Sequence, residues 1–355
     1  MSAERLHAPQ LPVLNGWRGL SILLVLAAHL APLGPKSWQL NYSSGILGMA
    51  IFFTLSGYLI TAALLREPRV RAFLVRRFTR VVPLAWLYFV IALVASDASV
   101  AEWFAHFLFY GNLPPRQLVP LTLHMWSLCV EVQFYIAAAI LVGFLRARGL
   151  WLLPLLGVLF TALRVWQGVY ASDISYFRID EILAGCTLAL LMHADAGASM
   201  RAQLARVPQW PLLALLVLSC MPIGAWLNFA RPYLAALLVG ATMVAPNTGL
   251  VRSLDQRFLL YLAVISYALY VIHPLLAATW LGEGDLVEKY AKRPLLLAAV
   301  FGLAHVSTYY FERWFIEHGR VLANRLSRKR AAGTPFSAAA VMPVATPLTG
   351  EKDGA

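Results

Sequence analysis

Long apolar runs, rather than alternating apolar and polar positions, dominate the chain between residues 18 and 311. A helix that crosses a membrane needs about 20 mostly apolar residues, so runs of this kind indicate transmembrane helices. Several runs are shorter than that, which predicts tilted or broken helices. The pattern predicts an all-α polytopic membrane protein with about ten transmembrane helices, at residues 18–33, 45–65, 81–96, 120–145, 150–168, 179–193, 210–227, 233–248, 258–280 and 294–311.

The segments outside these runs predict the domain organisation. Residues 102–113 are apolar and aromatic but too short to cross, so we expect a half-helix at the interface or against the bundle. After Arg330 the chain is rich in Ala, Pro, Thr and Gly and has no helical period, which is typical of disorder. We therefore expect one transmembrane domain over residues 1–315 and a basic, then disordered, cytoplasmic tail over residues 316–355.

The first apolar run resembles a secretory signal in its length and in the arginines that precede it. However, Ala27-Ala28-His29 is not a small-x-small cleavage site, and further apolar runs follow at once. We interpret the run as a retained first helix.

Composition and charge agree with the membrane class. Apolar residues make up 60% of the chain and charged residues only 13%, against about 25% charged in a typical soluble domain. The net charge of +12 arises from loops, because 20 of the 29 Lys and Arg fall on one side of the predicted topology. This bias predicts that both termini are cytoplasmic, and it argues against a nucleic-acid partner. Cys129, Cys186 and Cys220 lie in apolar runs without a CxxC motif, so neither a disulfide framework nor a metal site is expected.

Arg18 and His29 are ionisable groups in the first apolar run. They are 11 residues apart, which on a helix is three turns, so they share a face at about 16 Å along the axis. A snorkelling arginine and a hydrogen-bonded histidine would be a structural interpretation. Because ionisable groups within a span are costly, we also treat both as candidate functional residues.

Three arginines, Arg76, Arg77 and Arg80, directly precede the third run. A positively charged cytoplasmic loop would explain them without any site. Arg76 and Arg80 are four residues apart and would share a helical face, and guanidinium groups suit phosphate oxygens. An anionic cofactor at a cytoplasmic mouth is therefore the alternative hypothesis.

Later runs also contain ionisable groups. Glu131 lies inside the fourth run, with His124 on roughly the same face, and must face the bundle interior, a wet cavity or an arginine partner. Arg178 and Asp180 open the sixth run. In the ninth run His273 precedes Pro274, which should kink the helix and free a carbonyl. Binding of that carbonyl would be a structural interpretation of His273, and a site role is the alternative.

At these residues the chain resembles the membrane-bound acyltransferase family called acyltransferase 3, which includes O-acetyltransferases of bacterial surface polysaccharides. The resemblance covers about residues 11–315 and rests on six motifs in order. They are Arg18-x10-His29, the segment from Phe52 to Ile60, Arg76-Arg77-x-x-Arg80-x-x-Pro83, Trp126-Ser127-Leu128-x-x-Glu131-x-Gln133-Phe134-Tyr135, Arg178-x-Asp180, and Ser266-Tyr267-x-x-Tyr270-x-x-His273-Pro274.

The resemblance implies a ten-helix bundle in the bacterial inner membrane that moves an acyl group, acetyl by default, from cytoplasmic acyl-CoA to a hydroxyl of a carbohydrate or glycolipid. It makes His29 and Arg18 the essential pair, with Glu131 as a further catalytic candidate. Arg76, Arg77 and Arg80 would contact CoA. Substrate or supporting roles fall to Arg178, Asp180, Ser266, Tyr267 and His273.

Two mechanisms remain open, direct attack by the acceptor hydroxyl with His29 as base, and an acyl-histidine intermediate. Some family members carry an added extracytoplasmic hydrolase-like domain, and since this chain ends in a short tail, we expect no second transfer step on the same polypeptide. A transporter or flippase is the rival class, because buried charges also mark translocation pathways. Transporters often have two related halves, and no internal repeat is visible here.

Overall fold

The structure is a computed structural model that describes residues 12–193 and 197–332. Within these ranges the chain is helical, with connecting loops and no strand. The longer helices are α1 (Pro12–Leu30), α2 (Leu40–Arg66), α3 (Val70–Ala95), α5 (Trp126–Leu145), α10 (Leu227–Val244), α12 (Arg257–Ala277) and α15 (Arg313–Ala332). The shorter ones are α4 (Val100–Phe107), α6 (Leu153–Gln167), α7 (Asp180–His193), α8 (Gly197–Ala205), α9 (Gln209–Leu218), α11 (Gly249–Leu254), α13 (Leu286–Ala291) and α14 (Arg293–Val306).

Seven helical stretches of the described residues are long and apolar enough to cross a membrane, or eight if the bent pair α7 and α8 is one span. The all-helical class with several membrane spans is therefore confirmed. Each of the ten predicted runs contains a helix, but α6, α7 and α9 have only 15, 14 and 10 residues. Ten crossings and cytoplasmic termini remain predictions.

The predicted continuous run at 210–227 is wrong in one respect, because α9 ends at Leu218 and α10 begins only at Leu227. Pro222 has no backbone N–H to continue the helical ladder, and Ala225 has a positive φ of 43°. The chain therefore turns between residues 219 and 226. A hydropathy pattern does not register this turn, since the residues within it are mostly apolar.

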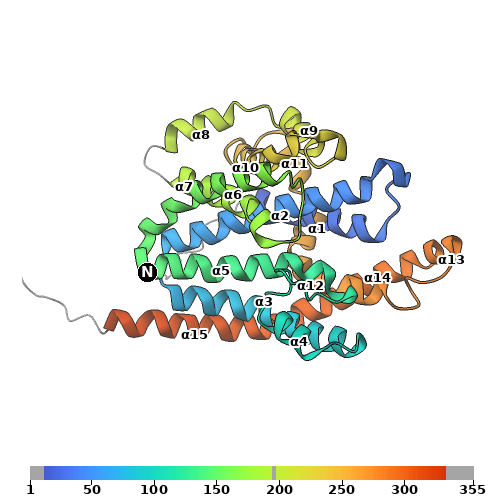
Figure 1. Cartoon of the computed structure of the whole chain (residues 1–355). Coiled ribbons are helices and arrows are strands. Elements are labelled where there is room, and N and C mark those ends of the chain that lie inside the picture. Colours follow the sequence, from blue (N-terminus) through green and yellow to red (C-terminus); the bar gives the residue numbers. More distant parts are fainter. Residues whose placement is uncertain (1–11, 194–196, 333–355) are drawn as a thin grey trace, which may run out of the picture.

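The helices form a bundle, and different connections and short helices lie at its two ends (Figure 1). We call the end with the connection 31–39 the α1–α2 end, and the end with the connection 67–69 the α2–α3 end. At the α1–α2 end lie α4 and α13, while α15 extends toward the α2–α3 end. α2 lies at the centre of the bundle, because 78% of its apolar stretch is buried, against 22% of the apolar stretch within residues 293–327.

Close helix contact requires glycine where α2 crosses α7. A Cβ at Gly57 would lie 1.9 Å from the carbonyl oxygen of Ile182, and one at Gly185 would lie 2.0 Å from that of Thr54. Small residues let two helix backbones approach in this way inside membranes. The crossing fixes the start of α7, and with it the charged residues 178–181, against the bundle.

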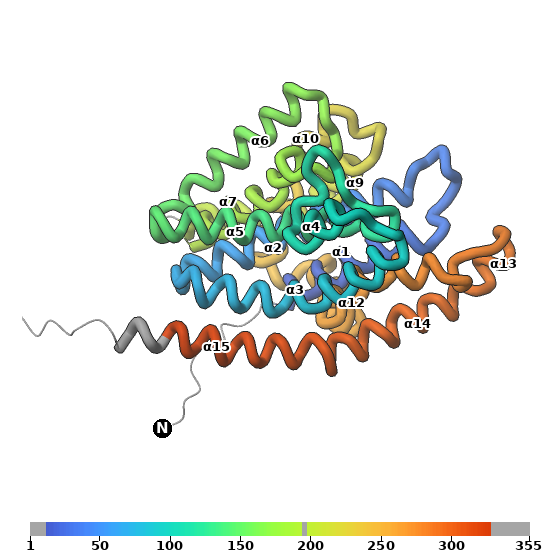
Figure 2. Tube along the Cα trace, turned by 60° about the horizontal axis from the view of Figure 1, so that its bottom comes forward, coloured from blue at the N-terminus to red at the C-terminus, as the bar shows by residue number. Residues whose placement is uncertain are grey.

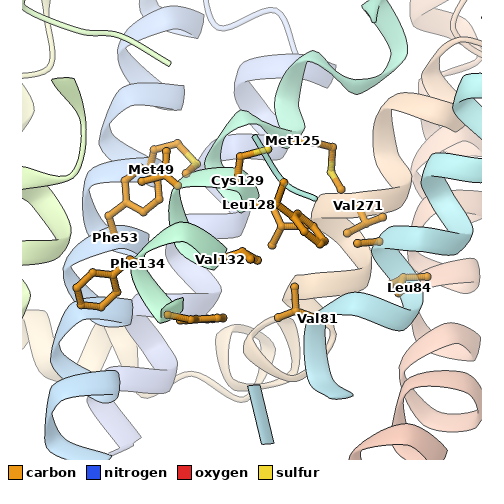
Figure 3. Packing of buried hydrophobic residues seen from close by; sticks show 14 of the residues in the cluster. Met49, Phe53, Val81, Leu84, Met125, Leu128, Cys129, Val132, Phe134 and Val271 are labelled. Carbon is orange, nitrogen blue, oxygen red and sulfur yellow. The ribbon is translucent and has the colours of Figure 1, made fainter. Parts of the chain in front are cut away.

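Packing of apolar side chains from different helices fills the centre (Figure 3). Met49 and Phe53 of α2, Leu128 and Cys129 of α5 and Val271 of α12 belong to one cluster of buried side chains. Large apolar side chains such as Phe144 and Trp166 are exposed on the outside, as expected of a surface that faces lipid. Cys129, Cys186 and Cys220 are buried and form no disulfide in the part of the chain that the structure describes.

Two peripheral segments bear on the predicted organisation. The predicted half-helix at 102–113 corresponds to the short α4 and the loop that follows it. Beyond α14 the chain continues through a π-helical turn (η6, Ser307–Glu312) into α15, which packs along α3 (Figure 2). The basic part of the predicted tail is therefore helical to Ala332, whereas residues 333–355 lie outside the described residues.

Candidate active site

One interior hollow lies among α1, α2, α3, α5 and α12, and we call it the arginine hollow. Its volume is 60 Å³. The polar side chains that line it include Arg18, Ser56, Arg77, Arg80, Glu131 and Tyr267. Residues that belong to separate motifs in the sequence thus lie around one hollow, because five helices contribute to it.

The guanidinium groups of the arginine hollow have no carboxylate partner. None of the ion pairs formed by the described residues includes Arg18, Arg77 or Arg80. Arg77 instead lies 5.8 Å from the ring centroids of both Phe73 and Tyr135. Three unpaired cations around one hollow form an electropositive site for an anion.

Arg76 differs from its two neighbours on α3. Its Nη2 lies 2.9 Å from Oε2 of Glu67, and it does not line the arginine hollow. Arg77 and Arg80 are three residues apart and line the same hollow, so the predicted face with Arg76 and Arg80 is not the one that the structure forms. Phe73 and Val81 are buried, and this fixes which face of α3 points inward. Arg76 is on another face and points toward Glu67 in the connection 67–69.

Glu131 is held by hydroxyl groups rather than by an arginine. Its Oε1 accepts hydrogen bonds from Ser56 Oγ at 3.0 Å and Tyr135 Oη at 2.5 Å. No ion pair among the described residues includes Glu131, so the salt bridge considered from the sequence is absent there. The carboxylate contributes one negative charge to a hollow with three positive charges.

The second hollow lies nearer the α1–α2 end, and we call it the histidine hollow. Its volume is 330 Å³. The polar and aromatic residues that line it include His29, Asn41, His124, Trp126, Arg178 and Tyr270. Asn41 has a structural role, because its Nδ2 donates to the carbonyls of Ala27, Ala28 and Ala31 at the end of α1.

The hydrogen bonds around His29 assign its tautomer. Nδ1 of His273 lies 3.0 Å and 2.9 Å from the carbonyl oxygens of Leu269 and Tyr270, so it carries the proton and Nε2 is an acceptor. Nδ1 of His29 lies 2.9 Å from the carbonyl of Val25 and 3.3 Å from Nε2 of His273. Both neighbours are acceptors, so Nδ1 of His29 is the donor. Nε2 of His29 then has a lone pair with no hydrogen-bond partner among the described residues, and the exposed side chain lines the hollow.

Pro274 explains why His273 is held so firmly. A proline lacks the N–H that would bond the carbonyl four residues earlier, which here is the carbonyl of Tyr270. His273 Nδ1 fills that vacancy, as the sequence predicted for a structural histidine. The same side chain also contacts His29, although it lines neither hollow, so a site role for His273 remains a prediction.

The two hollows meet at three shared lining residues, Val25, Met49 and Tyr270. Tyr270 Oη pairs with Ser127 Oγ at 2.7 Å and donates to the carbonyl of His124. Its position is thus set by two bonds at the boundary. A group that reaches past these three residues would pass from the arginine hollow to His29.

The predicted site residues divide between the hollows. Arg18, Glu131, Ser266 and Tyr267 line the arginine hollow, whereas His29 and Arg178 line the histidine hollow. Arg18 and His29 share α1, but the shared boundary separates them. Asp180 lines neither hollow and instead pairs with Arg164.

The sequence motifs did not assign roles to His124 and Tyr270. His124 lies in a 3-10 turn, η2 (Pro120–Met125), just before α5, which places it in the histidine hollow rather than beside Glu131. Tyr270 was present in the last motif, and its spacing of three residues from His273 was the available signal. Within residues 12–193 and 197–332, no cluster of three His, Cys, Asp or Glu side chains is placed to hold a metal ion.

The fold and the two abutting hollows define a class of protein, a helical membrane protein with an interior polar site. Residues 11–313 match a family model described as an acyltransferase domain. The chain therefore belongs to this acyltransferase family.

Curated relatives agree with that assignment. The chain is 24% identical to "Peptidoglycan O-acetyltransferase OatA" of Listeria monocytogenes, covering 85% of this chain and 55% of the relative. It is 24% identical to "O-acetyltransferase OatA" of Staphylococcus aureus, covering 76% of this chain and 51% of the relative. The chain thus spans about half the length of the curated relatives it matches. No solved structure matches it.

Proposed function

We propose that the chain is an integral membrane O-acyltransferase that moves an acyl group, acetyl by default, from acyl-CoA to a hydroxyl of a carbohydrate or glycolipid. The observation that carries the proposal is the pair of abutting hollows, one lined by unpaired arginines and one by a histidine with a free Nε2. Membership of the acyltransferase family supports it, as do relatives named for O-acetyl transfer.

The arginine hollow suits the donor. Arg18, Arg77 and Arg80 would bind anionic oxygens of CoA at its mouth, since guanidinium groups pair bidentately with phosphates. The thioester would then lie toward the boundary at Val25, Met49 and Tyr270. The C–S bond of the thioester would break there, and CoA would leave as a thiolate that takes up a proton.

The histidine hollow suits the acceptor. Nε2 of His29 would take the proton of the attacking hydroxyl as its oxygen bonds to the thioester carbon, and would later release that proton to the leaving thiolate or to water. His273 holds the imidazole in the required tautomer through the 3.3 Å contact. Attack by Nε2 itself, with an acyl-histidine intermediate, uses the same arrangement and remains the alternative route.

The proposed orientation puts the α2–α3 end in the cytoplasm of a bacterium, in its inner membrane. Arg66, Arg69 and Arg71 lie around the connection 67–69, and Arg146 and Arg148 follow α5. Loops rich in Lys and Arg are typical of the cytoplasmic side, where acyl-CoA is found. The donor hollow would then open toward its supply.

The test uses the purified full chain in proteoliposomes with acetyl-CoA labelled in the acetyl group. We expect cleavage of the thioester, faster when membrane glycans are added, with label recovered in ester linkage. A transporter or flippase would instead carry label across the bilayer without cleavage. That result, with no ester formed, would overturn the proposal.

A further inference from the structure

Five fully buried charged side chains form a cluster next to the histidine hollow. They are Arg164, Asp180, Arg178, Glu181 and Arg231, each at most 1% exposed. Arg164 pairs with Asp180, and Arg231 Nε lies 2.7 Å from Oε1 of Glu181. Three guanidinium groups face two carboxylates, so the cluster has a surplus of one positive charge.

The surplus charge falls on Arg178. Its Nε lies 3.2 Å from Oε2 of Glu181, but without the alignment of a hydrogen bond. Neither Nη1 nor Nη2 has a hydrogen-bond partner in the part of the chain that the structure describes. Arg164 and Arg231, in contrast, both donate to the carbonyl of Tyr170 besides their carboxylates. A buried charge with two unused donor groups is costly, so it indicates a ligand.

Arg178 lines the histidine hollow and not the arginine hollow. Its guanidinium lies 5.5 Å from the ring centroid of Trp126, which holds the planar group against one wall. No aspartate or glutamate lines the histidine hollow. Arg178 is therefore on the acceptor side of the boundary, together with His29 and apart from the groups that would bind the donor.

We propose that the histidine hollow recognises an acceptor that carries an anionic group, a carboxylate or a phosphate, near the hydroxyl that is acylated, and that Arg178 binds this group. The inference rests on the proposed function, since it names the chemistry of the acceptor. A guanidinium with Nη1 and Nη2 free forms two parallel hydrogen bonds to either anion. The acceptor thereby supplies the negative charge that the five-residue cluster lacks.

The experiment compares sugars that differ in charge, using the purified full chain in detergent micelles and microscale thermophoresis. One arm uses galacturonic acid and its methyl ester, and the other uses glucose 1-phosphate and methyl glucoside. We expect the wild-type chain to bind at least one anionic sugar roughly tenfold to hundredfold more tightly than its uncharged counterpart. The arm in which the preference appears identifies carboxylate or phosphate.

Variants assign the preference to Arg178. Arg178→Gln should bind the two sugars of a pair alike, and Arg178→Lys, which keeps the charge but not the fork, should retain only part of the preference. Arg116→Gln is the matched control, because Arg116 is exposed and pairs with Asp173 outside both hollows. If Arg178→Gln does not fold, the lysine variant still tests the claim, since an unchanged preference in it contradicts bidentate binding.

Acetyl-CoA binding by the wild-type chain, measured in the same preparation, tests the proposed function separately. Failure there would reject the donor site while leaving the charge preference to be measured. The inference is overturned if the wild-type chain binds charged and uncharged sugars alike, or binds none of them. It is also overturned if Arg178→Gln slows thioester cleavage without altering a charge preference, which would place Arg178 on the acyl oxyanion instead.

Discussion

Arg164 and Arg231 differ from Arg18 and Arg80 in how their charges are satisfied. The first two are fully buried and bonded to carboxylates and carbonyls, whereas the second two line a hollow and form no ion pair among the described residues. A paired charge inside a membrane protein holds segments together, and its cost is offset by its partners. An unpaired one on a hollow is available to a ligand. The comparison separates structural arginines from candidate binding arginines without reference to sequence motifs.

The largest effect should follow from breaking the paired set. Arg231→Ala removes the bond to Glu181 at 2.7 Å and leaves that carboxylate buried with Arg178 alone. Loss of one partner of a buried pair costs about 3–5 kcal/mol. We expect a lower thermal midpoint in detergent and little monodisperse protein, measured by scanning fluorimetry and size exclusion. Arg116→Ala, which breaks an exposed pair with Asp173, should change the midpoint little. Equal stability of the two variants would mean that the buried pair holds the fold no more strongly than the exposed pair does.

The next effect concerns activity rather than stability. His29→Gln keeps a hydrogen-bonding side chain but cannot take up a proton, so acyl transfer should fall at least about 10²-fold while the thermal midpoint is retained. His193→Gln is a matched control, because His193 Nδ1 also bonds the carbonyl four residues earlier, at 2.8 Å, and lines neither hollow. The measurement is the initial rate of labelled acetyl transfer by the two variants and the wild type. Near-normal transfer by His29→Gln would make the histidine structural and leave Glu131 as the candidate base.

Two arginines of α3 that lie four residues apart give a sharper version of the comparison. Arg80 lines the arginine hollow and forms no ion pair with another described residue, while Arg76 pairs with Glu67 at 2.9 Å. Arg80→Ala should raise the KM for acetyl-CoA about tenfold with a smaller change in kcat, because it removes a charge-assisted contact to the donor. Arg80→Lys should recover this only in part. Arg76→Ala should leave the KM almost unchanged, and a similar rise in both variants would mean that the ion pair does not separate them.

The sequence predicted the class of fold well because hydropathy is a local property. Runs of apolar residues such as those of α2 and α12 identify their own helices. It could not predict where α9 ends, because the turn at residues 219–226 is apolar and only its proline and its backbone geometry interrupt the helix. For the same reason, hydropathy alone does not determine the number of membrane crossings.

The candidate residues were also visible in the sequence, but not their distribution. Arg76 and Arg77 are neighbours of the same type, and only the packing of Phe73 and Val81 decides which one reaches the hollow. The contact of His29 with His273 joins residues 244 positions apart, which no local spacing encodes. Partners such as Glu181 and Arg231 likewise meet only through the tertiary fold.

The smallest effect tests how Glu131 is kept away from the unpaired arginines. Ser56→Ala removes the 3.0 Å hydrogen bond to Oε1 and leaves only that from Tyr135, so the carboxylate gains freedom to move within the arginine hollow. There it would compete with anionic oxygens of the donor for the same guanidinium groups. Since one hydrogen bond is worth about 1 kcal/mol, the KM for acetyl-CoA should rise roughly fivefold, with kcat little changed. Ser44→Ala is the matched control, because Ser44 is equally buried on α2 but donates to the carbonyl of Leu24 and lines neither hollow. If both serine variants bind acetyl-CoA as the wild type does, the position of Glu131 does not limit the charge available to the donor, and the three arginines alone set its affinity.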